Sequence, residues 1–217
     1  ITAGPTREFL DPVRFLSNPS SGRMGYELAR AARDRGANVT LVTGPTALEP
    51  PAGVEVVPVI SAAEMAAAVL GRYAEFDVII KAAAVADYTP VVRSDQKLKK
   101  TAAGDTLTLE LRRTPDILGE LGRRKGRRIL VGFAAESENL VANARAKLRA
   151  KQADLIVAND ITTPGAGFGG PTNQVVLVGP GETVETLPLL SKRQVAERIL
   201  DRVAALWRER RRTTGEG

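Results

Sequence analysis

Short apolar runs alternate along the chain with longer stretches in which apolar residues recur every three or four positions. The runs have the length of strands, whereas the periodic stretches are typical of amphipathic helices. The apolar runs fall at residues 1–4, 38–43, 54–59, 77–83, 128–133 and 154–158, and the helical stretches at 26–36, 61–73, 114–124, 138–150 and from 191 onward. This alternation predicts crossover units, and therefore an α/β, Rossmann-like fold with a mostly parallel sheet flanked by helices.

The end of the chain departs from this alternation. Residues 174–178 and 183–187 are short apolar segments separated by glycine and proline, which predicts a C-terminal hairpin. The four residues from Ser191 have the spacing of a capping box, so we expect a final helix to begin there. Thr114, directly before Pro115, is likewise expected to cap an earlier helix.

Two further segments interrupt the α/β pattern. Residues 85–113 form a polar insert, in which the alternating residues 106–111 predict an exposed strand with one apolar face that needs a partner. Residues 160–173 form a glycine-rich loop of the kind that carries binding residues. We expect a single domain over residues 1–207, followed by a disordered basic tail over residues 208–217.

A long loop joins the first strand to the first helix, where a simple nucleotide-binding fold has only a tight glycine turn. It covers residues 11–25 and contains Arg14, Asn18, Ser20 and Gly22. Ligands of open α/β sheets bind at the carboxyl ends of the strands, and the N–H groups at a helix start suit phosphate. Ser20 is explained equally well as an ordinary helix cap. We interpret the whole loop as a binding site for an anion.

Composition excludes several kinds of chemistry. The 217 residues include no histidine and no cysteine, which rules out a Ser-His-Asp triad, a thiolate metal site and disulfides. Asn, Lys, Arg, Asp and backbone groups, with or without a metal, must therefore carry any reaction. No apolar run approaches the roughly 20 residues that span a bilayer, so we expect a cytoplasmic protein with no membrane partner.

The formal charge of +6 favours anionic small substrates. Aromatic residues make up only 4% of the chain and do not alternate with basic ones, so no nucleic acid is expected as a partner. A basic nucleic-acid-binding module stays an alternative because residues 208–212 hold four arginines and one glutamate. An NAD(P)-dependent reductase is a second alternative, but it needs a G-x-G-x-x-G fingerprint, and Gly4 stands alone after the first strand.

Several segments carry a more specific inference, and they are Thr2–Arg7, Asp11–Asn18, Ser20–Gly25, Ala83–Tyr88, Lys97–Lys100, Thr114–Ile117, Gly132–Glu136 and Ala158–Asp160. As a set and in this order, they strongly resemble phosphopantothenoylcysteine synthetase (phosphopantothenate–cysteine ligase), the second enzyme domain of the bacterial bifunctional coenzyme A biosynthesis protein. The resemblance covers nearly the whole chain. It also implies that a flavin-dependent decarboxylase precedes Ile1, which is not a methionine.

The resemblance implies a reaction and its partners. The carboxylate of 4′-phosphopantothenate would attack the α-phosphate of a nucleoside triphosphate, CTP in the bacterial type, with Mg²⁺ bound to the triphosphate. The amine of L-cysteine would then displace the nucleotide from the acyl-nucleotide. The family also implies a homodimer, with residues 85–113 as a flap and dimerisation insert. Residues 1–207 would then be a single nucleotide-binding ligase domain.

Catalytic roles follow from the same resemblance. Asn18 would hold the acyl group of the intermediate, although it also fits a turn before a proline. Arg14 would organise the loop or meet substrate anions, unless it is an ordinary surface residue. Lys97 would reach the phosphates from a flexible loop, across a dimer interface, where sequence alone suggests a solvated lysine. Asp87 would contact the metal through the triphosphate, and otherwise caps a helix or turn.

The implied nucleotide site comprises Ser20, Gly22, Lys81, Ala82, Ala83, Asp87, Lys97, Pro115, Asp116, Ile117, Leu118, Phe133, Lys147 and Lys151. Lys147 and Lys151 are four residues apart on one helical face, a spacing that on sequence alone indicates a charged outer face, and only the resemblance places them at the nucleotide. Lys81 departs from the family, which usually has a small or apolar residue there. Because a buried, unpaired ammonium is costly, either Lys81 reaches into the nucleotide cleft or the sheet end is open at this point.

Overall fold

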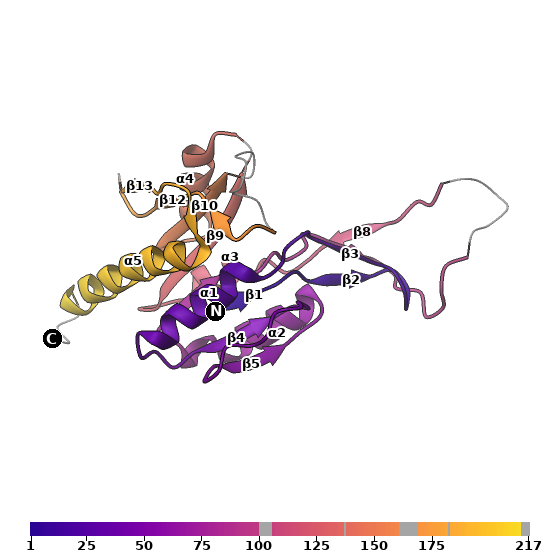
Figure 1. The fold of residues 1–217 in the computed structure, drawn as a ribbon. Helices are drawn as coiled ribbons and strands as arrows, with labels where there is room; N and C mark the ends of the chain where they lie inside the picture. The colour runs from indigo at the N-terminus through magenta and orange to yellow at the C-terminus, as the bar shows by residue number, and fades with distance from the viewer. Residues whose placement is uncertain (100–105, 137, 161–168, 182, 214–217) are drawn as a thin grey trace.

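The computed structural model describes residues 1–99, 106–136, 138–160, 169–181 and 183–213. An eight-stranded sheet lies at its centre (Figure 1). In order across the sheet, the strands are β13 (Val184–Thr186), β12 (Val175–Val178), β10 (Leu155–Asp160), β9 (Ile129–Glu136), β6 (Val78–Lys81), β1 (Thr2–Ala3), β4 (Thr40–Thr43) and β5 (Glu55–Pro58). The strands from β10 to β5 pair in parallel. Strand β12 pairs antiparallel with β10 on one side and with β13 on the other. The predicted mostly parallel α/β sheet is confirmed.

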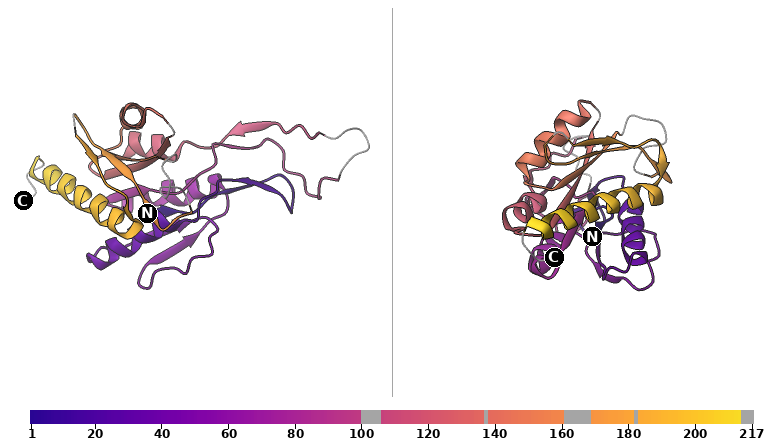
Figure 2. Two further views of the ribbon diagram at one scale, coloured as in Figure 1. Left: turned by 45° about the horizontal axis from the view of Figure 1, so that its top comes forward. Right: turned by 90° about the vertical axis from the view of Figure 1, so that its left-hand side faces the viewer.

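Helices cover both faces of the sheet. They are α1 (Arg23–Asp34), α2 (Ala62–Arg72), α3 (Ile117–Arg124), α4 (Leu140–Ala150) and α5 (Lys192–Thr213), with a short 3₁₀ helix, η1 (Tyr73–Glu75), after α2. Helices α1 and α5 pack side by side on one face (Figures 1 and 2). Helices α2, α3 and α4 pack on the other. The β–α alternation read from the sequence therefore becomes a three-layer domain.

Strand β9 explains why the sheet is buried on both sides. Ile129 and Val131 contact the core under α1 and α5, whereas Leu130 contacts the core under α2, α3 and α4. Successive side chains of a strand point to opposite faces, so a continuous apolar run fills both cores. The three side chains are fully buried.

The C-terminal part agrees with its sequence pattern. Strands β12 and β13 form the predicted hairpin. Ser191 and Gln194 form the predicted capping box, because the Gln194 N–H donates to the Ser191 hydroxyl (3.2 Å) and the Ser191 N–H donates to the Gln194 amide oxygen (3.0 Å). Strands β11 (Thr172–Asn173) and β14 (Leu190–Ser191) pair just before α5. Most of the glycine-rich loop, residues 161–168, lies outside the described residues.

Two strand pairs project from the domain as an arm (Figures 1 and 2). Strands β2 (Arg7–Phe9) and β3 (Phe15–Ser17) form an antiparallel hairpin. Strand β3 lies inside the predicted loop over residues 11–25, and β2 lies just before it. Strands β7 (Tyr88–Pro90) and β8 (Leu111–Arg113) form the base of the predicted insert. The prediction of an irregular loop over residues 11–25 is therefore wrong for residues 15–17, which pair with β2.

The predicted strand over residues 106–111 is also wrong for most of its length. Regular pairing with β7 begins only at Leu111, and one further backbone bond joins the Val91 N–H to the Glu110 oxygen (3.0 Å). The facing segment bends at Val91 and Val92, directly after Pro90, which has no N–H to donate. Residues 106–110 therefore have no regular strand partner within the described chain.

Helix α3 begins later than predicted. The Asp116 carboxylate, and not the Thr114 hydroxyl, caps it by accepting from the Gly119 N–H (3.0 Å). The Thr114 hydroxyl instead donates to the Ala86 carbonyl oxygen (2.6 Å). Thr114 thus ties the insert to the start of α3, and Pro115 lies just outside the helix.

The expectation of a disordered tail over residues 208–217 is wrong for residues 208–213, which continue α5. Arg210 holds this end, because its guanidinium donates to the Arg128 carbonyl (2.7 Å) and pairs with the Asp154 carboxylate (2.6 Å). Residues 214–217 lie outside the described part. Among the helices of the described ranges, none has the length and apolarity needed to cross a membrane.

Candidate active site

A cavity of about 710 Å³ opens at the carboxyl edge of the parallel strands. Its walls come from the start of α1, the ends of β6, β9 and β10, the start of α3, and α4. The predicted residues that line it are Asn18, Ser20, Gly22, Lys81, Ala82, Ala83, Asp87, Pro115, Asp116, Ile117, Leu118, Phe133, Lys147 and Lys151. Apart from Arg14 and Lys97, every residue of the predicted site is therefore gathered in one place.

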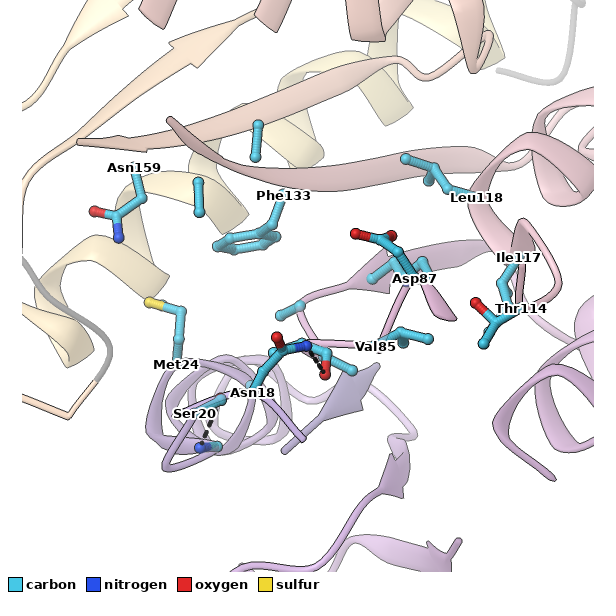
Figure 3. A pocket seen from close by; sticks show the side chains of 18 of the residues that line it. Asn18, Ser20, Met24, Val85, Asp87, Thr114, Ile117, Leu118, Phe133 and Asn159 are labelled. Carbon is cyan, nitrogen blue, oxygen red and sulfur yellow. Dashed lines mark hydrogen bonds between the residues drawn. The ribbon is translucent and has the colours of Figure 1, made fainter. Parts of the chain in front are cut away.

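Asn18 is anchored to the end of β6. Its side-chain Nδ2 donates to the Ala84 carbonyl oxygen at 3.1 Å (Figure 3). The backbone there is itself fixed, because the Ala84 N–H donates to the Gly4 oxygen (3.0 Å) and the Ala83 N–H donates to the Thr2 hydroxyl (3.1 Å). Asn18 is half-buried and lines the cavity. Among the described residues, this is the one hydrogen bond of the amide group, which leaves its other N–H and its oxygen for a ligand.

The start of α1 lies directly on the first strand. Gly22 is the cap residue with φ of 79°, a backbone conformation that favours glycine, and its N–H donates to the Ser20 hydroxyl (3.3 Å; Figure 3). A side chain at Gly25 would place its Cβ 2.5 Å from the Ala3 Cβ. This close approach brings the positive end of the helix to the cavity, where it favours an anion.

Three lysines gather on the opposite wall. Lys151 pairs with the Asp116 carboxylate (2.6 Å). Within the described residues, Lys81 and Lys147 have neither a hydrogen bond nor an ion pair for their ammonium groups, although both are half-buried. Two uncompensated ammonium groups beside one cavity are costly unless an anion joins them.

The electrostatics of this wall follow from burial. Burial, together with the neighbouring charge of Lys147, lowers the pKa of Lys81 to about 8. Burial also lowers the pKa of Lys147. Burial alone would raise the pKa of Asp116, but hydrogen bonds from Lys151 and the Gly119 N–H outweigh it and lower that pKa. Lys81 lines the cavity, which agrees with the first of the two alternatives that its strand position left open.

Aromatic and acidic groups complete the interior. The Phe133 ring projects from β9 into the middle of the cavity, and the Asp87 carboxylate points into the same space from the loop after β6 (Figure 3). No group of three or more metal-ligating side chains occurs in the part of the chain that the structure describes. Asp87 is a single exposed carboxylate, which fits a Mg²⁺ ion held mainly by a nucleotide's phosphates and not by a protein cage.

Sequence reasoning missed several residues of the cavity. Arg23 and Lys192 add cations near the start of α1, and burial followed by the charge of Arg23 lowers the pKa of Lys192. Asn159 at the end of β10 lines the cavity, is 7% exposed, and has a buried side-chain oxygen without a hydrogen-bond partner. Asn159 lies in Ala158–Asp160, one of the segments on which the family resemblance rests, so the sequence contained a signal that could have identified it as a site residue. Lys192 has no comparable signal, because it reaches the site only through the packing of α5.

Arg14 and Lys97 lie on the arm and do not line the cavity of this chain. Arg14 pairs with the Asp11 carboxylate at 3.1 Å and donates to the Leu98 carbonyl. Lys97 is exposed beside Leu98. Arg14 lies in the β2–β3 turn, and Lys97 lies on the segment bound to that turn. Both residues are apart from the other predicted groups.

Comparisons with known proteins were made for the whole chain. Residues 1–206 match the family model described as the DNA/pantothenate metabolism flavoprotein C-terminal domain. A coenzyme A biosynthesis bifunctional protein, CoaBC, of Bacillus subtilis (strain 168) is 52% identical over all of this chain and 52% of its own length. This chain therefore spans about half the length of that curated relative.

Solved structures agree with this match. The crystal structure of the C-terminal domain of a CoaBC protein superposes with a TM-score of 0.82 at 45% identity, covering 96% of this chain and 94% of that one. A DNA/pantothenate metabolism flavoprotein from Streptococcus pneumoniae superposes with a TM-score of 0.81 at 26% identity, covering 94% and 96%.

Proposed function

Because this chain belongs to the family of DNA/pantothenate metabolism flavoprotein C-terminal domains, we propose that it is a phosphopantothenate–cysteine ligase of coenzyme A biosynthesis. One observation carries the proposal: an anchored amide, Asn18, shares a cavity with a large excess of cations. The charged residues that line the cavity are Arg23, Lys81, Arg113, Lys147, Lys151 and Lys192 against Asp87 and Asp116. Six cations and two carboxylates suit a triphosphate and a phosphorylated acid.

The proposed reaction has two steps. In the first, a carboxylate oxygen of 4′-phosphopantothenate bonds to the α-phosphorus of CTP, and the bond from that phosphorus to the bridging oxygen breaks, releasing pyrophosphate. In the second, the amine of L-cysteine bonds to the acyl carbon, and the carbon–oxygen bond to the phosphate breaks, releasing CMP. The amine gives up a proton to solvent. No protein nucleophile is needed, which agrees with a chain that lacks histidine and cysteine.

Residues of the cavity position these groups. The lysines Lys81, Lys147 and Lys151 would bind the nucleotide, and the start of α1 would bind an anionic group of the substrates. The free N–H of Asn18 would donate to the acyl carbonyl oxygen, on which negative charge develops during attack by the amine. Positioning and charge neutralisation are the main contributions a protein makes to such transfers.

Mg²⁺ belongs to the same proposal. Asp87 would contact the ion, which would otherwise be held by phosphate oxygens and water. When bound, the ion supplies positive charge that neutralises the triphosphate. This assignment is supported by the Asp87 carboxylate, which lines the same cavity as Lys81, Lys147 and Lys151.

A homodimer is the assembly that goes with this function. Apolar side chains are exposed along the arm, among them Phe15 (40%), Val92 (79%) and Leu107 (61%). Lys97 lies on the same arm and outside this chain's cavity, so we propose that it serves the cavity of a second copy. We also propose that the ligase works in the cytoplasm beside a flavin-dependent decarboxylase, since the curated relatives are about twice as long and bifunctional by name.

Pyrophosphate release tests the function directly. We expect release with CTP and 4′-phosphopantothenate, and formation of the amide only when L-cysteine is added. ATP, GTP and UTP serve as matched alternatives in parallel reactions. No release with any of the four triphosphates would sink the proposal, and release with ATP alone would overturn the choice of CTP.

The pKa of Lys81 predicts a pH dependence of nucleotide binding. Because this pKa is about 8, the ammonium is charged below pH 8 and becomes neutral as pH rises through it, so affinity for CTP falls from pH 7 to pH 9. The loss should reach about tenfold per pH unit at most, since one proton is involved. Calorimetric titrations of wild type and Lys81→Met would measure it. The variant should bind more weakly at pH 7 and lose much of the slope, while Lys147, whose pKa is also lowered, leaves a residual slope.

A further inference from the structure

Asp11 is a buried carboxylate at the tip of the β2–β3 hairpin, outside the cavity. Its side chain is fully buried, accepts three hydrogen bonds and forms one ion pair. Oδ1 accepts from the Val13 N–H and the Arg14 N–H, each at 2.8 Å. Oδ2 accepts from the Leu98 N–H at 3.1 Å and pairs with the Arg14 guanidinium at 3.1 Å. One oxygen therefore shapes the hairpin turn, and the other binds a segment 87 residues away.

The bound segment follows the hairpin tip over several residues. The Ser94 N–H donates to the Leu10 carbonyl at 2.9 Å, and the Arg93 guanidinium lies over the Phe9 ring, 5.2 Å from its centre. The Leu98 carbonyl accepts from Arg14. Both backbone groups of Leu98 are thus held by the hairpin, and Lys97 is the residue directly before it.

The carboxylate is charged at neutral pH. Burial alone would raise the pKa of Asp11, but the backbone N–H groups of Val13, Arg14 and Leu98, together with the charge of Arg14, outweigh it and lower that pKa. The charge strengthens each of the bonds it accepts. A neutral amide of the same shape would keep one acceptor oxygen and turn two N–H donors toward the existing donors.

We propose that Asp11 is a positioning residue for Lys97: its carboxylate holds the Arg93–Leu98 backbone on the hairpin, so that the Lys97 ammonium is presented to the triphosphate from a fixed place. This inference rests on the proposed ligase function. A lysine on an untethered segment would have to lose its backbone freedom in every turnover. The hairpin and the Asp11 bond fix that backbone beforehand.

Asp11→Asn tests the proposal, with Asp95→Asn as the matched control. Asp95 is an exposed carboxylate on the Arg93–Leu98 segment. The control therefore removes one negative charge and leaves the hydrogen bond between Asp11 and Leu98 unchanged. We expect Asp11→Asn to lower the kcat for pyrophosphate release from CTP about 10–100-fold and to leave the melting temperature within a few degrees. The control should keep wild-type turnover. Unchanged turnover in Asp11→Asn would overturn the proposal.

Hydrogen–deuterium exchange separates this inference from the ligase assignment. The peptide covering residues 94–99 should exchange at least about tenfold faster in Asp11→Asn than in wild type, with no substrate present. If the wild-type protein uses no triphosphate, the ligase proposal is wrong, but the exchange rate still shows whether Asp11 holds residues 94–99. Unchanged exchange in the variant means that Asp11 does not hold the segment, and the proposal is then wrong.

A double variant excludes a merely structural role. Adding Asp11→Asn to Lys97→Gln should lower single-turnover pyrophosphate release no further, because both changes act through one ammonium. A further loss of tenfold or more would show that Asp11 acts elsewhere. Should Asp11→Asn not fold, Leu98→Pro removes the N–H that this segment donates to Asp11, and also restricts the backbone at residues 97 and 98, and it should reproduce the loss of turnover. A fully active Leu98→Pro variant would contradict the proposal.

Discussion

An Asn18→Asp variant is expected to make the acyl-nucleotide and then fail to convert it to the amide. The wild-type side chain has one N–H bound to the Ala84 oxygen and a second available to the acyl carbonyl. Aspartate removes both donors and adds a negative charge where negative charge develops. Loss of one such donor costs about 10²–10³-fold in kcat, and the added charge should bring the loss to at least that range.

Quenched-flow analysis can follow the intermediate and the product separately in this variant. Pyrophosphate should be released in an initial burst, after which cysteine should not accelerate further turnover. Asn18→Ala is the matched control, since it loses the donors without gaining a charge, and it should retain more amide formation than Asn18→Asp. Wild-type amide formation in Asn18→Asp would refute the role assigned to this residue.

A Lys97→Gln variant is expected to lose triphosphate use almost completely. Cations that neutralise a transferring phosphoryl group are worth about 10³–10⁵ in rate, and glutamine keeps a polar, slightly shorter side chain without the charge. Lys99→Gln is the matched control, because Lys99 lies on the same exposed segment and has no assigned role. Single-turnover pyrophosphate release should fall at least about 10³-fold in Lys97→Gln and remain near wild type in the control.

The same variant tests assembly. If Lys97 serves the cavity of a second copy, mixing Lys97→Gln with the Asn18→Asp variant should restore activity, because one cavity of each mixed dimer has both wild-type groups. About half of the wild-type activity per mixed dimer is the ceiling. Absence of any recovery, with mixed dimers demonstrated by light scattering and mass spectrometry, would place Lys97 at its own chain's cavity or outside the site.

The central sheet and its helices could be predicted because their signals are local. The apolar run of β9 fills both cores, and the Ser191 capping box begins α5 as its spacing indicated. Such features depend on a few consecutive residues. The cavity at the carboxyl edge of the sheet follows from the same regularities, since parallel strands end at one edge.

The features that sequence did not predict either are very short or depend on distant contacts. Strands β2 and β3 have three residues each, too few for a clear alternation, and the turn between them is built on the Asp11 carboxylate. The cap of α3 passed from Thr114 to Asp116 because the Thr114 hydroxyl is used by Ala86. Lys192 enters the cavity only because α5 packs beside α1. Ala86 lies 28 residues from Thr114, and α1 lies far from Lys192 in the chain, so a local pattern does not reveal these partners.

The charged end of α5 illustrates the same limit. Residues 208–212, with four arginines, were predicted to belong to a disordered tail, yet Arg210 binds the backbone of Arg128 and the carboxylate of Asp154. These acceptors lie before β9 and β10, at least 56 residues away in the chain. A local charge count cannot anticipate partners at such separations.

The two packed cores contain no residue of the arm within the ranges that the structure describes. The base of the arm still contributes a contact to the domain, because the buried Glu8 carboxylate accepts from the Ala62 N–H at the start of α2 (2.8 Å). Apart from Glu8, substitutions in these strands are expected to change turnover and the pairing of two copies more than the melting temperature. A compound that binds under the arm is accordingly expected to abolish the proposed ligase activity and to leave the domain folded.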